Sequence, residues 1–294
     1  QLPAVLADRE FGRAVVGTWK NGESRVKLEE NVRGSDVFVI QSLCDPVNHH
    51  IVELLLMIDA VKRASAARIT AVIPYYAYAK QEKKTSGREP ISAKLVANLI
   101  CTAGADRILT IDLHAPAIQG FFDIPVDHLR ATPLIARHLR REGIENVVAV
   151  SPDAGGVART EDFRVRAGGS LAIISKRHPG PAVSEALEMV GDVDGKSAVI
   201  VDDMISTGGT LVLAAETLKE RGAARVYAAA THGIFAADAL TSIERSPIER
   251  VFVTDTVPLP TSGPTAKIDT MSVAPLLAEA IMRIHKDLSI SALF

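Results

Sequence analysis

The chain has 294 residues, a length that accommodates two domains of ordinary size. Hydrophobic residues make up 47% of the sequence, charged residues make up 23%, and the formal net charge is −2, so the composition is globular and argues against a nucleic-acid-binding surface or a disordered tail. The two cysteines, Cys44 and Cys101, suit a reducing compartment, and no apolar run approaches the roughly 18 residues of a membrane span, so we expect a cytoplasmic protein with no membrane or nucleic-acid partner.

The first part of the chain alternates predicted strands and helices. A helical pattern at Leu2 to Phe11 starts directly after Gln1, so we expect that a strand before this helix is missing from the sequence. Asn21-Gly22, close to the chain's only tryptophan, Trp19, is typical of a hairpin turn, and one interpretation is a surface turn without a ligand. Apolar runs predict strands at 13–18, 36–41, 69–74 and 107–113, and helices are predicted at 50–66 and 91–103.

Polar and basic side chains follow two of these predicted strands. The segment Tyr75 to Arg88 is rich in lysine, and it is either a solvated surface or a loop that meets a polyphosphate at the end of a strand. Asp112 and His114 lie at the end of the strand at 107–113. His114 is therefore either a structural histidine or a ligand.

The same alternation restarts near residue 131. A helix is predicted at 134–142, and a strand at 147–150 ends in the turn Ser151 to Gly156. Further strands are predicted at 171–174, 198–201, 225–230 and 250–254. The repeated alternation predicts an α/β fold of two domains, residues 1–131 and 132–282, each a mostly parallel sheet flanked by helices.

A basic segment interrupts the second half of the chain. Ser175 to Pro181 contains Lys176, Arg177 and His178, and its proline and glycine residues predict an exposed loop. This loop is either a solvated connector or a segment that closes over phosphate groups.

The segment Ala198 to Thr210 carries the strongest signal in the chain. A buried strand at 198–201 is followed by Asp202 and Asp203, and then by a small-residue loop, 206–210, that precedes a helix predicted at 211–221. Unpaired N–H groups and the helix dipole favour a phosphate at such a loop, and the aspartates can accept hydrogen bonds from sugar hydroxyls or hold a hydrated Mg²⁺. The alternative is a turn whose aspartates cap the helix. The string resembles the phosphoribosyl-pyrophosphate loop of the type I phosphoribosyltransferase fold.

Further segments extend the resemblance over nearly the whole chain. They are NGE (21–23), RGSDVFVIQS (33–42), REPISAKLVANL (88–99), DLHAPAIQGFFDIPVDHL (112–129), SPDAGG (151–156) and SISALF (289–294). Together they resemble the ribose-phosphate pyrophosphokinases, also called phosphoribosyl-pyrophosphate synthetases, of the phosphate-activated type. The resemblance implies two phosphoribosyltransferase-like domains and a Mg²⁺-dependent kinase of nucleotide biosynthesis. This transferase moves the pyrophosphoryl group of ATP to the C1 hydroxyl of ribose 5-phosphate, giving 5-phosphoribosyl 1-pyrophosphate and AMP.

The resemblance also implies roles for individual residues. ATP would be bound within residues 1–131 by Trp19, Asn21, Gly22, Glu23, Lys80 and Gln81. Ribose 5-phosphate would be bound within residues 132–282 by Asp202, Asp203, Ser206, Thr207, Gly208, Gly209 and Thr210. His114 and Asp153 would hold Mg²⁺, one from each domain, which implies a reaction at the domain boundary. Lys176 would stabilise the transferring group.

Four positions depart from the family pattern. Trp19 stands in place of a phenylalanine, Lys80 in place of an arginine and Ser206 in place of an acidic residue, changes that keep the aromatic stacking, the positive charge and a hydrogen-bond donor. His178 stands in place of a catalytic arginine. Either His178 works as an imidazolium, or Arg177 takes over the role.

Regulation is implied by the resemblance as well. The family forms hexamers built from dimers and responds to inorganic phosphate and ADP, which implies a homohexamer with both effectors. The effector contacts would be Ser42, Arg88, Ser289 and Ser291, and the tail at about 283–294 would pack on the amino-terminal domain. The alternative function, motivated by His178 and Ser206, is a catalytically silent homologue that binds and regulates an active synthetase.

Overall fold

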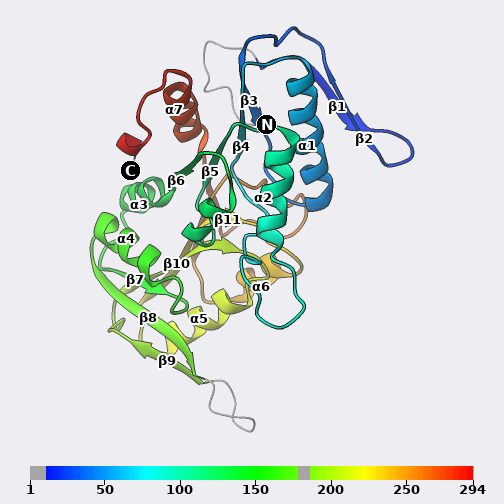
Figure 1. The fold of residues 1–294 in the computed structure, drawn as a ribbon. Coiled ribbons are helices and arrows are strands. Elements are labelled where there is room, and N and C mark those ends of the chain that lie inside the picture. Colours follow the sequence, from blue (N-terminus) through cyan, green and yellow to red (C-terminus); the bar gives the residue numbers. More distant parts are fainter. Residues whose placement is uncertain (1–10, 178–185, 294) are drawn as a thin grey trace. The chain divides into compact units, whose positions relative to one another are not determined.

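The computed structural model describes residues 11–177 and 186–293 (Figure 1). The helix expected at Leu2 to Phe11 therefore lies outside the described residues, apart from Phe11 itself. The chain forms two compact units, which we call unit 1 (Gln1–Arg130 with Val273–Phe294) and unit 2 (Ala131–Ser272). Among the helices of the described residues, none combines the length and the apolarity that crossing a bilayer requires.

Unit 1 is built on a four-stranded parallel sheet of strand order β3-β4-β5-β6. These strands are β3 (Asp36–Ile40), β4 (Arg68–Ile73), β5 (Arg107–Ile111) and β6 (Val126–Leu129). A separate antiparallel hairpin pairs β1 (Ala14–Thr18) with β2 (Ser24–Leu28). The helices are α1 (Val47–Arg63), α2 (Ser92–Ala103) and α7 (Ala274–His285), with short 3-10 turns η1 (Pro116–Phe121) and η2 (Ser291–Leu293).

Burial explains why the apolar runs of unit 1 fold in this way. Along β4 the residues from Ile69 to Ile73 are all buried, as expected for a central strand that is covered on both faces. In α1 the buried residues are Ile51, Leu54, Ile58 and Val61, and this spacing gives the helix one apolar face.

Unit 2 contains a seven-stranded sheet of order β13-β12-β11-β10-β7-β8-β9, in which only the β8–β9 pair is antiparallel. Its strands are β7 (Val147–Ser151), β8 (Ser170–Arg177), β9 (Ala186–Val190), β10 (Ser197–Ile205), β11 (Arg225–Gly233), β12 (Arg250–Thr254) and β13 (Ile268–Met271). Its helices are α3 (Thr132–Arg141), α4 (Val157–Ala167), α5 (Gly209–Glu220) and α6 (Ala239–Arg245). The predicted α/β class, with mostly parallel sheets flanked by helices, is confirmed.

Two predicted boundaries in unit 2 are wrong. The strand predicted at 198–201 continues to Ile205, because Asp202, Met204 and Ile205 pair with β11 and extend the parallel ladder. Ser175 to Arg177, predicted as part of a loop, belong to strand β8. Lys176 is paired with Leu187 and Arg177 with Ala186 of β9, a strand that the sequence pattern did not reveal.

Candidate active site

The predicted phosphate loop joins β10 to the amino terminus of α5 in unit 2. Gly208 immediately precedes the helix with a left-handed backbone (φ 77°), a conformation that glycine adopts without strain. Thr207, Gly209 and Thr210 are exposed, and a Cβ atom built on Gly209 would meet no atom within 4 Å. The first N–H groups of a helix have no partner within the helix, so an anion can approach the backbone at this position.

Asp202 and Asp203 lie in the carboxyl-terminal half of β10, whose last two residues separate Asp203 from this loop. Nη1 of Arg159 donates a hydrogen bond of 2.9 Å to Oδ1 of Asp202 and lies 3.2 Å from Oδ1 of Asp203. The Asp203 side chain is only 2% exposed, whereas that of Asp202 is 34% exposed. Asp202 is thus the more accessible of the two carboxyl groups.

The electrostatics of Asp202 follow from this environment. Burial is the main cause that raises the pKa of the Asp202 carboxyl to about 7, and the hydrogen bond and negative charge of Asp203 add to it. Arg159 acts in the opposite direction and favours the ionised carboxylate. The site therefore combines two adjacent acids with one cation that compensates them.

Asp153 lies in the turn between β7 and α4. Its Oδ1 accepts a hydrogen bond of 2.8 Å from the backbone N–H of Gly156, and its carbonyl oxygen accepts one of 2.7 Å from Oγ of Ser151. Asp153 is exposed, so the turn presents a fixed carboxylate to solvent. Carboxylate oxygens are preferred ligands of hard cations, so Asp153 fits a Mg²⁺ ligand.

In unit 1, the segment that follows β5 holds the other predicted metal ligand, His114. Asp112 is buried with a left-handed backbone (φ 39°), which is uncommon for a residue other than glycine. The N–H of Asp112 bonds to the carbonyl of Leu129, and that of Leu113 donates to Nε2 of His128 at 2.8 Å. Strand β6 thus fixes the backbone that leads to His114.

Glu82 links His114 to the lysine-rich segment. Burial raises the pKa of the Glu82 carboxyl, but hydrogen bonds and the charges of Lys83 and His114 outweigh burial and hold that pKa below its usual range. Lys83 lies 3.1 Å from Glu82. Part of the positive charge of this segment is therefore neutralised within the segment itself.

The residues predicted to bind ATP come from two places in unit 1 (Figure 1). Trp19 lies at the turn of the β1–β2 hairpin, where the residue is 52% exposed and the Arg25 guanidinium stacks 4.7 Å from the ring centroid. The same turn contains Asn21, Gly22 and Glu23, and Oδ1 of Asn21 accepts a hydrogen bond from the N–H of Glu23.

Lys80 and Gln81 lie in the segment that connects β4 to α2. Both residues are exposed. Oε1 of Gln81 accepts a hydrogen bond of 2.6 Å from Oγ of Ser92 in the first turn of α2. The helix thus fixes the orientation of the Gln81 side chain, while Lys80 extends into solvent.

Two of the three predicted catalytic residues lie at the end of β8. Lys176 and Arg177 are the last two residues of that strand, paired with β9. His178 lies outside the described residues. The structure therefore places the backbone of Lys176 and Arg177 on an edge ladder of the sheet, where the sequence predicted a loop.

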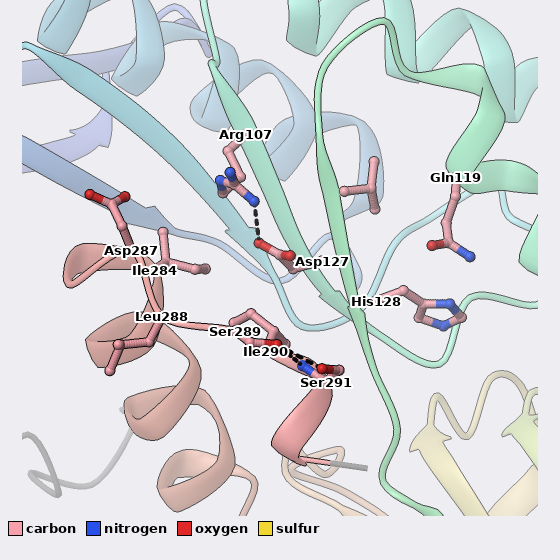
Figure 2. Close-up of a pocket in the computed structure, with 11 residues that line it drawn as sticks. Arg107, Gln119, Asp127, His128, Ile284, Asp287, Leu288, Ser289, Ile290 and Ser291 are labelled. Carbon is pink, nitrogen blue, oxygen red and sulfur yellow. Dashed lines mark hydrogen bonds and ion pairs between the residues drawn. The ribbon is translucent and has the colours of Figure 1, made fainter.

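The predicted effector residues separate into two groups. Ser289 and Ser291, whose Oγ atoms are 2.6 Å apart, line a cavity of about 560 Å³ together with residues of β5 and β6 (Figure 2). Arg107 and Asp127 form an ion pair of 2.8 Å in this cavity. Ser42 and Arg88 belong to unit 1 but do not line it.

A second group of potential metal ligands lies elsewhere in unit 2. His138, Glu142 and Asp269 place one ligand atom each within 4.8 Å of one another. Arg250 forms ion pairs with both carboxylates, at 2.5 Å from Glu142 and in close contact with Asp269. A guanidinium already compensates these charges, so the group is an ion-pair network and a less suitable cation site than Asp153.

Comparison with known proteins identifies the family. Residues 5–104 match the family model described as the N-terminal domain of ribose phosphate pyrophosphokinase, and residues 146–294 match the phosphoribosyl synthetase-associated domain. The ribose-phosphate pyrophosphokinase of Caldanaerobacter subterraneus subsp. tengcongensis is 54% identical over 290 residues, which cover 98% of this chain and 90% of that protein. The protein of the same description from Clostridium acetobutylicum is 52% identical over 287 residues, covering 97% and 90%.

A solved structure agrees with these sequence matches. The crystal structure of phosphoribosylpyrophosphate synthetase from Mycobacterium smegmatis is similar to this chain with a TM-score of 0.91 and 43% identity, covering 97% of this chain and 94% of that one. Both family models, the curated relatives and the solved structure indicate the same family. The chain belongs to the ribose-phosphate pyrophosphokinase family.

Proposed function

We propose that this chain transfers the pyrophosphoryl group of ATP to the C1 hydroxyl of ribose 5-phosphate, which yields 5-phosphoribosyl 1-pyrophosphate and AMP. The observation that carries this proposal is the arrangement at the end of β10: two carboxyl groups of the strand lie a few residues before an open loop at a helix amino terminus. Relatives that are 50–54% identical over nearly the whole of this chain are named ribose-phosphate pyrophosphokinases.

Unit 2 binds ribose 5-phosphate in this proposal. The 5-phosphate lies against the backbone of the loop, with Ser206, Thr207 and Thr210 as hydroxyl donors and Gly208 and Gly209 leaving the backbone accessible. Asp202 and Asp203 accept hydrogen bonds from the ribose hydroxyls. The loop and the carboxylates thereby fix the two ends of the sugar phosphate, which positions its C1 hydroxyl for an in-line attack.

Unit 1 binds ATP. Trp19 offers an exposed side chain for the adenine base, and Asn21, Gly22 and Glu23 belong to the same hairpin turn as further contacts of ATP. Lys80 supplies an exposed cation for the phosphates, and Gln81 is held by α2 as a hydrogen-bonding partner. The assignment of ATP to unit 1 and of ribose 5-phosphate to unit 2 follows from the location of these residues in the chain.

Mg²⁺ is the metal that this reaction requires, with Asp153 and His114 as its proposed protein ligands. The exposed carboxylate of Asp153 suits a hard cation, and the bond from Gly156 holds it in one orientation. When bound, Mg²⁺ neutralises negative charge on the phosphates of ATP.

The charge that moves during transfer needs a cationic partner on the protein. Lys176 is the residue that we assign to this task, with Arg177 or His178 as the second cation.

We further propose a homohexamer that responds to inorganic phosphate and ADP. Ser289 and Ser291 contact these anions in the cavity beside β6, and Ser42 and Arg88 are further effector contacts.

The decisive experiment is the incubation of the purified chain with ATP, Mg²⁺ and ribose 5-phosphate, followed by quantification of AMP. AMP should form only when ribose 5-phosphate is present, and the Lys176→Met variant should lower its rate by about a hundredfold or more, as expected for an electrostatic group in transfer. A folded chain that releases no AMP, yet changes the rate of an active synthetase added to it, would support the regulatory alternative instead.

A further inference from the structure

Arg159 occupies a position that the helix itself disfavours. It is the third residue of α4, whose amino terminus carries the positive end of the helix dipole. Its side chain is only 19% exposed, so water screens the charge incompletely. A buried cation in the first turn of a helix needs a compensating partner from elsewhere in the fold.

That partner is the aspartate pair of β10. One nitrogen of Arg159, Nη1, contacts Oδ1 of both carboxylates, at 2.9 Å from Asp202 and 3.2 Å from Asp203. Two neighbouring carboxylates repel each other when both are ionised, and a cation that bridges them offsets the repulsion. The bridge also fixes the two Oδ1 atoms relative to each other.

The Asp153 turn leads directly into the same helix. Gly156, whose N–H bonds to Asp153, lies three residues before Arg159 in the chain. A Cβ atom built on Gly156 would lie 3.8 Å from Nη1 of Arg159. Arg159 therefore contacts the proposed sugar-binding pair and lies in the first turn of the helix that follows the proposed metal ligand.

We infer that Arg159 is a positioning residue for ribose 5-phosphate, which holds the carboxyl groups of Asp202 and Asp203 side by side where they can accept hydrogen bonds from the sugar hydroxyls. The inference rests on the proposed function, because it deepens the role of the same site. Arg159 acts through the aspartates, so its loss should weaken sugar binding more than it slows the transfer step.

The test compares the Michaelis constants of four proteins. Arg159→Met should raise the KM for ribose 5-phosphate about tenfold or more, lower kcat less than threefold and leave the KM for ATP unchanged. Arg159→Lys should restore most of the lost affinity, because a single nitrogen makes both contacts in the parent. Arg164→Met is the matched control: it removes a guanidinium from the same helix that pairs with Glu161 only three residues away, and it should behave as the parent.

A double-mutant cycle separates positioning from direct contact with the substrate. If Arg159 acts through Asp202, adding Arg159→Met to Asp202→Asn should raise the KM for ribose 5-phosphate by less than twofold beyond Asp202→Asn alone. Independent, multiplicative effects would overturn the inference, and so would an Arg159→Met variant with the parent's KM. If Arg159→Met does not fold, Arg159→Gln takes its place under the same criteria. A parent protein that makes no AMP would refute the proposed function. An active parent whose KM for ribose 5-phosphate does not change on substitution of Arg159 would refute this inference alone.

Discussion

Oδ1 of Asp153 accepts a hydrogen bond of 2.8 Å from the backbone N–H of Gly156, three residues later in the chain. This bond closes the turn that connects β7 to α4 and holds the carboxylate in one orientation. Space in the turn is limited, since a Cβ atom on Gly156 would lie only 2.9 Å from Oγ of Ser151, which itself bonds to the carbonyl of Asp153. The Gly156 backbone is right-handed (φ −84°), a conformation that other residues also adopt. The turn therefore requires glycine because space is limited, and not because of its backbone conformation.

Gly156→Ala should consequently displace Ser151 and loosen the turn around Asp153. We expect a loss of about 1–2 kcal/mol in the free energy of unfolding, as for an overpacked interior, and a higher Mg²⁺ concentration for half-maximal rate. Denaturant titration and Mg²⁺ titration of the rate check the two effects. Ser151→Ala provides the control, because removing Oγ makes room for the new methyl group. The double variant should be more stable than the sum of the single changes predicts, and strict additivity would contradict the steric explanation.

The parts of the site that depend on local sequence could be predicted. The apolar run of β4, the turn at Asn21-Gly22 and the loop at 206–210 each carry their signal within a few neighbouring residues, and the structure has the expected strand, hairpin and helix start there. The helix and strand boundaries in the structure differ from the predicted ones by a few residues, because pairing between distant segments extends or ends an element. Strand β10 is the clearest case, since its ladder with β11 carries Asp202 and Asp203 into the strand.

The parts that depend on contacts between distant residues could not be predicted. Arg159 and Asp202 are 43 positions apart, so no local pattern connects them. The only available signal was a cation in the first turn of a helix, where the dipole disfavours it. Strand β8 was missed beyond residue 174 because the proline and glycine residues that follow Arg177 suggested a loop, whereas pairing with β9 continues the strand. Strand β6 spans only four residues and forms beside β5.

Gly208 and Gly209 should respond differently to the same substitution. Gly208 has φ 77°, so Gly208→Ala should cost about 1–2 kcal/mol in the free energy of unfolding. Gly208→Asn should be less harmful, because asparagine tolerates this conformation better. Gly209 is free of this strain and has open space around it, so Gly209→Ala should leave stability within about 0.5 kcal/mol of the parent.

Activity measurements give the second half of this comparison. A methyl group at Gly209 would fill space at the proposed 5-phosphate site, so Gly209→Ala should raise the KM for ribose 5-phosphate about tenfold, as expected for losing close backbone contacts with a charged group. Thermal unfolding of the Gly208→Ala and Gly209→Ala variants measures their stability, and steady-state kinetics measures their KM for ribose 5-phosphate. A Gly209→Ala enzyme with the KM of the parent would place the phosphate elsewhere.

Asp202 should make the stability of the substrate-free protein depend on pH. Its pKa is raised to about 7, chiefly by burial and then by Asp203, so the folded chain keeps a proton that the unfolded chain releases at a lower pH. Between about pH 4 and pH 7 the folded state binds more protons, and the free energy of unfolding therefore falls as pH rises. Asp202→Asn is uncharged at every pH. In denaturant titrations without Mg²⁺ or substrate, its free energy of unfolding should equal that of the parent near pH 4 and exceed that of the parent at pH 8. Equal pH dependence in both proteins would show that Asp202 is ionised throughout.

Arg68 should stabilise unit 1 by connecting its sheet to α7. It forms two hydrogen bonds with Asp36, at 2.9 and 2.6 Å, and further bonds with Asp287 and the carbonyl of Ile284, each at 3.0 Å. The Asp36 side chain is 14% exposed, and the Arg68 bond is the main cause that holds the pKa of that carboxyl below its usual value, although burial opposes it. Arg68→Met would leave this carboxylate with the ring of His285, whose Nδ1 lies 2.9 Å from Oδ2, as its remaining partner. The variant should lower the free energy of unfolding by about 2 kcal/mol at pH 7, an amount between those of exposed and buried pairs.

The pH dependence of this loss has a definite sign. A carboxyl group whose pKa is lowered on folding stabilises the protein above its unfolded pKa and loses that contribution as the pH falls, so the gap between parent and Arg68→Met should narrow below about pH 4. Arg63→Met is the matched control, because Arg63 pairs with Asp59 on the exposed surface of α1 and its removal should have no measurable effect. Denaturant titrations of the three proteins at pH 7 and at about pH 3 test this sign, because the second value lies below the unfolded pKa of the carboxyl group. A gap that is equal at both values would mean that Arg68 stabilises unit 1 through its contacts with α7 alone.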